Sequence, residues 1–305
     1  MRLRLGSRGS RLALWQAHHV ASRLSAAWPG LTVDIVIIKT EGDRRTDMPL
    51  TASFGEGVFV KEIEEALAAE TIDLAVHSLK DLPTVTKDGL AIAAIPRRHD
   101  PRDALVCAKA QRVEDLPQGA RVATGSPRRR SQLLHVRNDL QFSVVRGNVD
   151  TRLGKLDQGQ FDALILAVSG IERLGIENVP YTPIPLDVCL PAAGQGALAI
   201  ETRAGDAETR RLVLPLDDAE TASCVGAERA FLAELGAGCL APAGALGSIV
   251  SGTLRLDAMI GDPDGRRQMR DRAEGGLVEA EALGAGLARK LIRAGADAIL
   301  KAARS

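Results

Sequence analysis

This 305-residue chain has few aromatic residues, no excess of either charge and no long apolar run. Only 3% of the residues are aromatic, which argues against a stacking platform for single-stranded nucleic acid. Lysine plus arginine number 39, as do aspartate plus glutamate, so no net basic charge indicates nucleic-acid binding. No apolar run reaches the roughly 18 residues that a membrane helix needs. The composition predicts a globular protein of two or three domains, with no membrane or nucleic-acid partner.

Cysteine is also rare, with residues at positions 107, 189, 224 and 239. None forms a C-x-x-C pair and no histidine stands beside them at ligand spacing, so we expect no metal site. The first ten residues lack the apolar core of a secretory signal peptide. We therefore expect a cytoplasmic protein with reduced thiols. Cys239 lies in a loop of small residues, whereas Cys224 follows a helical pattern typical of a core position.

Along the chain, segments with the apolar pattern of strands are followed by segments with the apolar spacing of helices. Strands are expected at 3–5, 33–38, 74–77, 90–95, 121–124, 142–145, 163–167 and 198–201, and helices at 10–24, 59–67, 126–134 and 148–156. This order predicts two α/β units with mainly parallel sheets. The apolar run 33–38 is typical of a strand buried on both faces. Strand 198–201 could return to the first sheet, which would give two crossovers between the units.

The pattern changes after residue 220. A helix through Phe231 and Leu235 is followed by a small-residue loop, a hairpin turn at 262–265, and a long alanine-rich helix from 277 to about 303. The expected domains are residues 1–97 plus 197–216, residues 101–192 and residues 219–305. The predicted fold class is thus two α/β domains joined by hinge crossovers, plus a small α+β C-terminal domain.

The segment 124–130, Thr-Gly-Ser-Pro-Arg-Arg-Arg, indicates an anion site. Ser126 at the N-cap and Pro127 at the first helical position would leave an open helix N-terminus beside three arginines. Arginine outnumbers lysine 31 to 8 in the chain, and its planar fork of donors suits carboxylate or phosphate. A solvated basic face and a GC-rich coding sequence are the alternative explanations.

A second polar cluster, residues 73–83, follows an expected strand, at the edge where open α/β sheets bind ligands. Within it Asp81 could serve as a general base or stabilise a cation, and Lys80 could bind an anion. Residues 7–10 again place donors after a strand, but they lack the full G-x-G-x-x-G of a dinucleotide fingerprint. An ordinary loop of solvated charges is the alternative.

Several stretches in this order resemble the porphobilinogen deaminase family. They are residues 10–17, 59–64, 73–83, 100–104, 146–153, 163–175, 190–197 and 238–239. Together they extend from about residue 3 to residue 242, and their combination is far more specific than any one of them.

The resemblance implies a fold of three domains, two of them similar to the lobes of periplasmic binding proteins with the active cleft between. It also implies a dipyrromethane cofactor held by Cys239 through a thioether and assembled from porphobilinogen. On this primer four more porphobilinogens condense head to tail with loss of ammonia, and water releases hydroxymethylbilane. The family is that of transferases of tetrapyrrole biosynthesis, usually monomeric, whose product passes to uroporphyrinogen-III synthase.

Site residues also follow from the resemblance. Each pyrrole carries two carboxylates, which the cleft must neutralise. Asp81 matches the family's catalytic aspartate, which stabilises the cation that remains when porphobilinogen loses ammonia and assists the later deprotonation. The cofactor-binding residues implied are Cys239, Lys80, Arg128, Arg129, Ser126, Thr124, Ser78, Arg146 and Gly147. The substrate-binding residues implied are Arg8, Ser10, Gln16, Arg146, Arg152 and Arg173.

One loop departs from the family pattern. Within residues 43–57 this chain has Ala52 and Glu56 where the family often has lysine, which puts the substrate-gating role of the loop in doubt. Two rival functions remain: a two-lobed anion-binding protein without catalysis and an arginine-dependent nucleic-acid binder. The first leaves Cys239 and the missing export signal unexplained, and the second would require binding with a steep salt dependence.

Overall fold

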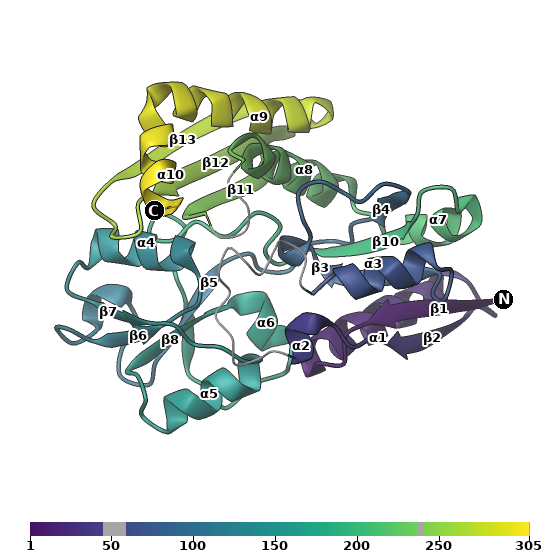
Figure 1. Cartoon of the computed structure of the whole chain (residues 1–305), viewed down its shortest axis with the longest axis horizontal. Helices are drawn as coiled ribbons and strands as arrows, with labels where there is room; N and C mark the ends of the chain where they lie inside the picture. The colour runs from purple at the N-terminus through teal and green to yellow at the C-terminus, as the bar shows by residue number, and fades with distance from the viewer. Residues whose placement is uncertain (45–58, 237–240, 305) are drawn as a thin grey trace. The chain divides into compact units, whose positions relative to one another are not determined.

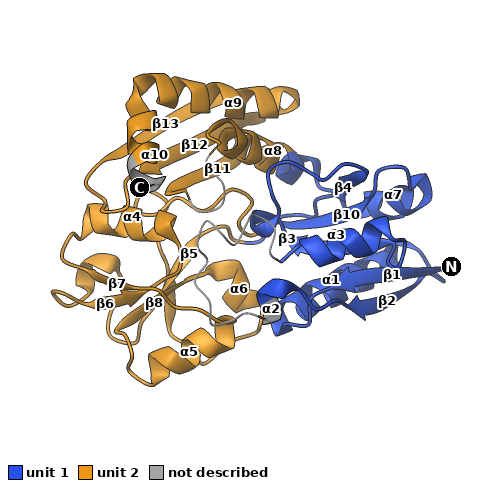
Figure 2. Ribbon diagram, viewed as in Figure 1, with its two compact units in different colours: residues 1–99, 197–222 blue, residues 100–196, 223–305 orange. Residues whose placement is uncertain are grey.

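The computed structural model describes residues 1–44, 59–236 and 241–304. The chain divides into two compact units, residues 1–99 with 197–222 and residues 100–196 with 223–305 (Figure 2). The described residues contain two five-stranded sheets and one three-stranded sheet (Figure 1). The α/β class with a smaller C-terminal sheet is confirmed, while the boundaries of three separate domains stay a prediction.

The sheet of the first unit has the order β2-β1-β3-β10-β4. Its strands are β1 (Arg2–Ser7), β2 (Thr32–Ile37), β3 (Leu74–Ser78), β4 (Leu90–Ala94) and β10 (Leu198–Arg203). Strand β1 pairs in parallel with β2 and β3, whereas β10 runs antiparallel to β3 and β4. The expected return of the chain to this sheet at β10 is thus confirmed, and the sheet is mixed rather than wholly parallel.

Helices cover both faces of this sheet. The helices of this unit are α1 (Arg11–Ala27), α2 (Glu41–Arg44), α3 (Lys61–Ala68), η1 (Leu79–Asp81), α7 (Ala207–Val213) and η3 (Leu214–Leu216), of which α1, α3, α7 and η3 pack on the strands. Val20 and Leu24 of α1 join Leu5 in one buried cluster, and α3 contributes Ile63 and Leu67 to another. Alternate side chains of the strands therefore enter two cores, as the pleat requires.

Strand β2 differs from its expectation. It is an edge strand of partly exposed residues, and 57% of the Ile37 surface is accessible. The apolar run was a misleading signal because burial on both faces belongs to the central strands, which here are β1, β3 and β10.

The first sheet of the second unit has the order β7-β6-β8-β5-β9. Its strands are β5 (Asp103–Val106), β6 (Arg121–Ala123), β7 (Gln141–Ser143), β8 (Ala163–Ala167) and β9 (Tyr181–Pro183). Strand β6 is parallel to β7 and β8, and β5 is antiparallel to β8 and β9. Both five-stranded sheets therefore share one topology, in which the strand after each crossover, β5 or β10, enters antiparallel.

Local capping explains where the helices of this sheet begin. They are η2 (Val113–Asp115), α4 (Pro127–Val136), α5 (Val149–Asp157) and α6 (Val168–Arg173). Ser126 caps α4 by accepting a hydrogen bond from the backbone N–H of Arg129 at 3.4 Å, and Pro127 is the first helical residue. Asn148 caps α5 in the same way through Thr151 at 2.9 Å. The sequence predicted both starts.

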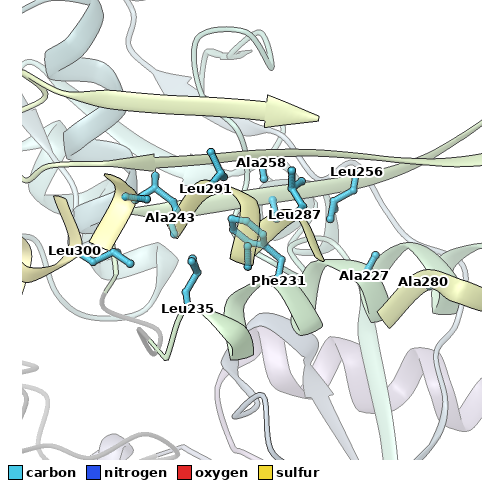
Figure 3. Close-up of a cluster of buried hydrophobic side chains, with 14 of the residues drawn as sticks. Ala227, Phe231, Leu235, Ala243, Leu256, Ala258, Ala280, Leu287, Leu291 and Leu300 are labelled. Atoms are coloured by element: carbon cyan, nitrogen blue, oxygen red, sulfur yellow. The ribbon is translucent and has the colours of Figure 1, made fainter. Parts of the chain in front are cut away.

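The C-terminal part is a three-stranded antiparallel sheet with helices packed on it. Its elements are α8 (Ala219–Glu234), β11 (Ala243–Val250), β12 (Thr253–Gly261), β13 (Gln268–Gly275), η4 (Leu277–Glu279), α9 (Ala280–Leu291), η5 (Ile292–Ala296) and α10 (Asp297–Arg304). Figure 3 shows Phe231 of α8 facing Leu287 of α9 beneath the strands, and both side chains are buried. The expected hairpin turn at 262–265 joins β12 to β13.

The long helix expected from 277 to about 303 is interrupted. Residues 292–296 form a π-type turn in which Gly295 has φ of +107°, so α9 and α10 are separate helices. Alanine-rich composition predicts helix throughout, but a glycine can adopt this left-handed backbone at little cost and end the regular hydrogen bonding.

Candidate active site

A pocket in the first unit lies at the edge where β1 and β3 end. Because these strands are parallel, the residues that follow them meet at one edge of the sheet. The pocket is lined by Arg8, Ser10, Leu12, Ala13, Gln16, Phe59, Val60, Ile63, Val76, His77, Ser78 and Asp81. It therefore brings together five residues singled out from the sequence: Arg8, Ser10, Gln16, Ser78 and Asp81.

Two contacts define the polar side of this pocket. The Gln16 amide, in a residue only 3% exposed, donates a hydrogen bond from Nε2 to Oγ of Ser78 at 2.8 Å. The guanidinium carbon of Arg8 lies 4.1 Å from the centre of the Phe59 ring. The pocket thus combines hydrogen-bonding groups and a cation, as a site for a carboxylated ligand needs.

A buried His–Glu pair adjoins the pocket, and His77 is one of the lining residues. His77 Nε2 lies 3.1 Å from Glu201 Oε2, and their side chains are 4% and 1% exposed. Burial raises the pKa of nearby Glu64, and the negative charge of Glu201 raises it further. The sequence analysis included His77 in the segment 73–83 without assigning it a role, and it did not identify Glu201. The two residues are 124 positions apart in the sequence, so no local pattern indicates that they pair.

Lys80 and Asp81 lie on η1, directly after β3. The turn is attached to the neighbouring strand region, since the Leu79 N–H donates to the carbonyl of Ala197 at 3.1 Å. Asp81 lines the pocket, whereas Lys80 is not among the lining residues. Both predicted site residues therefore belong to one short turn, and Asp81 is the one that lines the pocket.

The remaining predicted residues follow parallel strands of the second unit. Thr124 and Ser126 follow β6, and Arg146 and Gly147 follow β7. Arg173 is the last residue of α6, the helix that follows β8. Thr124 Oγ1 accepts a hydrogen bond from the backbone N–H of Ser126 at 3.2 Å. Because β6 is parallel to both β7 and β8, all of these residues belong to one edge of that sheet.

Arg128 and Arg129 are buried beside Asp103, which sequence reasoning had not selected. Their exposures are 4%, 6% and 0%. Arg128 Nη1 donates to Asp103 Oδ2 at 2.7 Å, and Arg129 Nε donates to Asp103 Oδ1 at 2.9 Å. Burial would raise the pKa of Asp103, but the two guanidinium charges hold it well below its usual range. Asp103 is therefore an ionised carboxylate between two cations.

Arg146, Arg152 and Arg173 have different surroundings. Arg146 and Arg152 are half-buried, and Arg152 Nε donates to the carbonyl of Gly147 at 2.9 Å. Arg173 is 4% exposed and donates from Nη2 to the carbonyl of Gly196 at 2.6 Å. Burial lowers the pKa of Arg173 to about 10, so the residue remains a cation at neutral pH.

Cys239 and residues 45–58, including Ala52 and Glu56, lie outside the described residues. The other three cysteines are buried free thiols. Burial raises the pKa of the Cys189 thiol to about 12, which keeps it neutral and unreactive. The expectation that Cys224 is a core residue is confirmed by its exposure of 6%.

Metal-ligand clusters and membrane-spanning helices are both absent from residues 1–44, 59–236 and 241–304. Among them there is no group of three or more histidine, cysteine, aspartate or glutamate residues that could hold a metal ion. No helix within them is long and apolar enough to span a membrane.

The Gln16–Ser78 contact gives a stability prediction. Ser78→Ala should lower the free energy of unfolding by about 1–3 kcal/mol, because it leaves the buried Gln16 amide without this acceptor. The double variant Gln16→Met with Ser78→Ala removes donor and acceptor together and should recover most of that loss. Urea denaturation of the three proteins measures both effects. A Ser78→Ala protein as stable as its parent would contradict the prediction.

Comparison with known proteins gives matches over nearly the whole chain. Residues 3–211 match the family described as "Porphobilinogen deaminase, dipyromethane cofactor binding domain", and residues 222–293 match "Porphobilinogen deaminase, C-terminal domain". Among solved structures, the methionine binding protein MetQ aligns with a TM-score of 0.43 and 15% identity, over 70% of this chain and 89% of that one.

Curated relatives carry the same description. The porphobilinogen deaminase of Syntrophotalea carbinolica is 47% identical over 98% of this chain and 95% of its own length. That of Roseiflexus castenholzii is 48% identical over 98% of both chains. With both family domains matched in order and relatives this similar over nearly their full length, the chain belongs to the porphobilinogen deaminase family.

Proposed function

We propose that this chain is a hydroxymethylbilane synthase, a transferase that condenses four porphobilinogen molecules head to tail on a covalently bound dipyrromethane primer. Each coupling releases ammonia, and hydrolysis releases linear hydroxymethylbilane for tetrapyrrole biosynthesis. The observation that carries the proposal is the match of both family domains over residues 3–211 and 222–293. The pocket that gathers Arg8, Ser10, Gln16, Ser78 and Asp81 supports it.

The buried residues fit a primer that carries carboxylates. Arg128 and Arg129 share one carboxylate, Asp103, so the cluster retains one positive charge. Nε of Arg128 is buried and has no hydrogen-bond partner within the described part of the chain. An excess buried cation with a free donor is suited to one ligand carboxylate.

The residues that would hold the primer are those that the resemblance to the family implies. Cys239 would attach it as a thioether, and the non-covalent contacts would come from Lys80, Ser78, Thr124, Ser126, Arg128, Arg129, Arg146 and Gly147. When bound, the dipyrromethane supplies the nucleophilic pyrrole carbon from which the chain grows. Arg8, Ser10, Gln16, Arg146, Arg152 and Arg173 would bind substrate carboxylates.

Asp81 is the residue to which we assign the chemistry. Its carboxylate lines the pocket and can accept hydrogen bonds from pyrrole N–H groups. The same charge stabilises the cation left when porphobilinogen loses ammonia, and it can take up the proton released as each new pyrrole regains aromaticity. Arg8 and Gln16 hold carboxylate groups in the same pocket and thereby orient the substrate.

Further parts of the proposal rest on the family alone. They are a cytoplasmic location, a monomeric state and transfer of the product to uroporphyrinogen-III synthase. The division into domains 1–97 plus 197–216, 101–192 and 219–305 belongs to the same proposal.

Intact mass tests the proposed function directly. After incubation with porphobilinogen, the purified protein should gain two porphobilinogen units less two ammonias, and the solution should accumulate hydroxymethylbilane. Mass spectra under reducing conditions exclude a disulfide-linked adduct. A protein that binds porphobilinogen without mass gain or ammonia release would favour the anion-binding alternative and overturn the enzymatic one.

A further inference from the structure

Asp103 is the centre of a completely buried network in the second unit. Besides the two arginines, Gln195 Nε2 donates to Asp103 Oδ1 at 2.9 Å, and Cys189 Sγ lies 3.4 Å from Oδ2. Four side chains, those of Arg128, Arg129, Gln195 and Cys189, thus surround one carboxylate. Since Asp103 has no accessible surface, water does not compete for its oxygens.

The two arginines use their donors differently. Arg129 contacts Asp103 through Nε and Nη2, and its Nη1 donates to the carbonyl of Ile165 at 3.0 Å, so all three nitrogens are engaged. Arg128 directs Nη1 to Asp103 and to the carbonyl of Leu190 at 2.5 Å, while its Nε has no partner among the described residues. Arg128 is therefore the one of the two with a buried guanidinium nitrogen that has no acceptor among the described residues.

The charges do not balance. Asp103 contributes one negative charge against the two guanidinium groups, and the Cys189 thiol is neutral at pH 7 because its pKa is about 12. A buried excess cation costs free energy unless an anion pairs with it. The network is therefore incomplete by one negative charge.

The backbone holds Asp103 firmly. It begins β5, a strand flanked by β8 and β9, and its carbonyl accepts a hydrogen bond from the Ile184 N–H at 2.7 Å. The Gln195 amide that contacts its carboxylate also donates to the carbonyl of Pro101 at 2.7 Å. Asp103 thus connects the first turn of α4 to two segments of the second unit, one that begins it at Pro101 and one near Gln195.

From these contacts we infer that Asp103, itself held by Gln195, is a positioning residue for the primer. It occupies Arg129 and orients Arg128, whose remaining donors take one pyrrole carboxylate and complete the charge balance. This inference rests on the proposed function and adds two residues to it, neither of which touches the reacting atoms.

The test compares primer loading in Asp103→Asn with that in Asp139→Asn. Asp139 also pairs with arginine, through Arg137 at 2.7 Å just beyond the other end of α4, and is therefore a matched control. Each apoprotein is titrated with porphobilinogen, and intact mass gives the concentration that loads half of the folded protein. Thermal unfolding of both variants reports any general loss of structure.

Asp103→Asn should need roughly 10- to 100-fold more porphobilinogen for half-loading, because removal of one partner leaves the buried cations misplaced and uncompensated. Asp139→Asn should load like the parent. A folded Asp103→Asn protein that loads at the parental concentration would overturn the inference while the proposed function stands. A parent protein that never gains mass would overturn both.

Gln195→Leu provides a second test if Asp103→Asn does not fold. This change keeps every charge and removes only the amide that contacts Asp103 and Pro101. Half-loading should require several-fold more porphobilinogen, with a melting temperature close to that of Asp139→Asn. Loading equal to the parent in folded Gln195→Leu would overturn the positioning role.

Discussion

Replacing Asp81 by asparagine should lower the rate of hydroxymethylbilane formation by roughly 10²- to 10⁴-fold, the usual contribution of a positioned acid–base group. Asparagine has nearly the same shape, so the pocket and its carboxylate-binding residues should remain in place. It carries no charge to stabilise the substrate cation, and it cannot accept the proton. Turnover under saturating porphobilinogen, measured on protein already loaded with primer, isolates this effect on kcat.

Asp88→Asn is the matched control for Asp81→Asn. Asp88 is another exposed aspartate of the first unit, close in sequence, and it does not line the pocket. Its variant should turn over like the parent. Equal activity in Asp81→Asn would remove Asp81 from the proposed chemistry, whereas a raised KM with unchanged kcat would reassign it to substrate binding.

The parts of the fold that the sequence predicted well are those determined by neighbouring residues. The start of α4 follows from Ser126 and Pro127, and that of α5 from Asn148, because capping depends on residues within one turn. Strand β8 was predicted with its observed bounds, since its apolar run is central and buried. Strand β2 shows the limit of the same signal, because the pattern alone does not say which strand lies at the edge.

Two strands of the second unit and the long-range partners of Asp103 were not predicted from the sequence. Strands β5 and β9 were not predicted, although β6 and β7, which are no longer than these, were; β5 pairs with both β8 and β9, and β9 pairs with β5. Asp103 looked like one acid in a charged motif. Its burial depends on Arg128, 25 residues later, and Gln195, 92 residues later. Such contacts follow from topology rather than local pattern.

For the candidate site, the sequence indicates which strand ends carry the residues but not which of their donors are available. The rule that ligands bind beyond the carboxyl ends of strands selected residues 7–10 and 73–83 separately, and in the structure Arg8, Ser10, Ser78 and Asp81 line one pocket. The rule does not distinguish a donor that is available from one already used. Arg128 and Arg129 are adjacent in sequence and looked equivalent, yet only Arg128 retains an unpaired Nε among the described residues.

Cys239→Ser should abolish the mass gain on incubation with porphobilinogen and reduce product formation to background. A serine hydroxyl, which does not ionise near neutral pH, cannot replace a thiolate as the nucleophile that forms the anchoring bond. The other described cysteines do not offer a substitute, since all three are buried and the high pKa of Cys189 keeps it protonated. Intact mass of parent and variant, each as purified and after incubation, measures the effect.

Cys107→Ser is the control, because it changes a buried thiol of the second unit that packs in an apolar cluster containing none of the assigned site residues. It should gain the same mass as the parent. An unchanged mass gain in Cys239→Ser would mean that another group anchors the primer, and peptide mapping of that protein would identify it. A gain lost in Cys239→Ser and kept in Cys107→Ser would assign the attachment to the segment between α8 and β11.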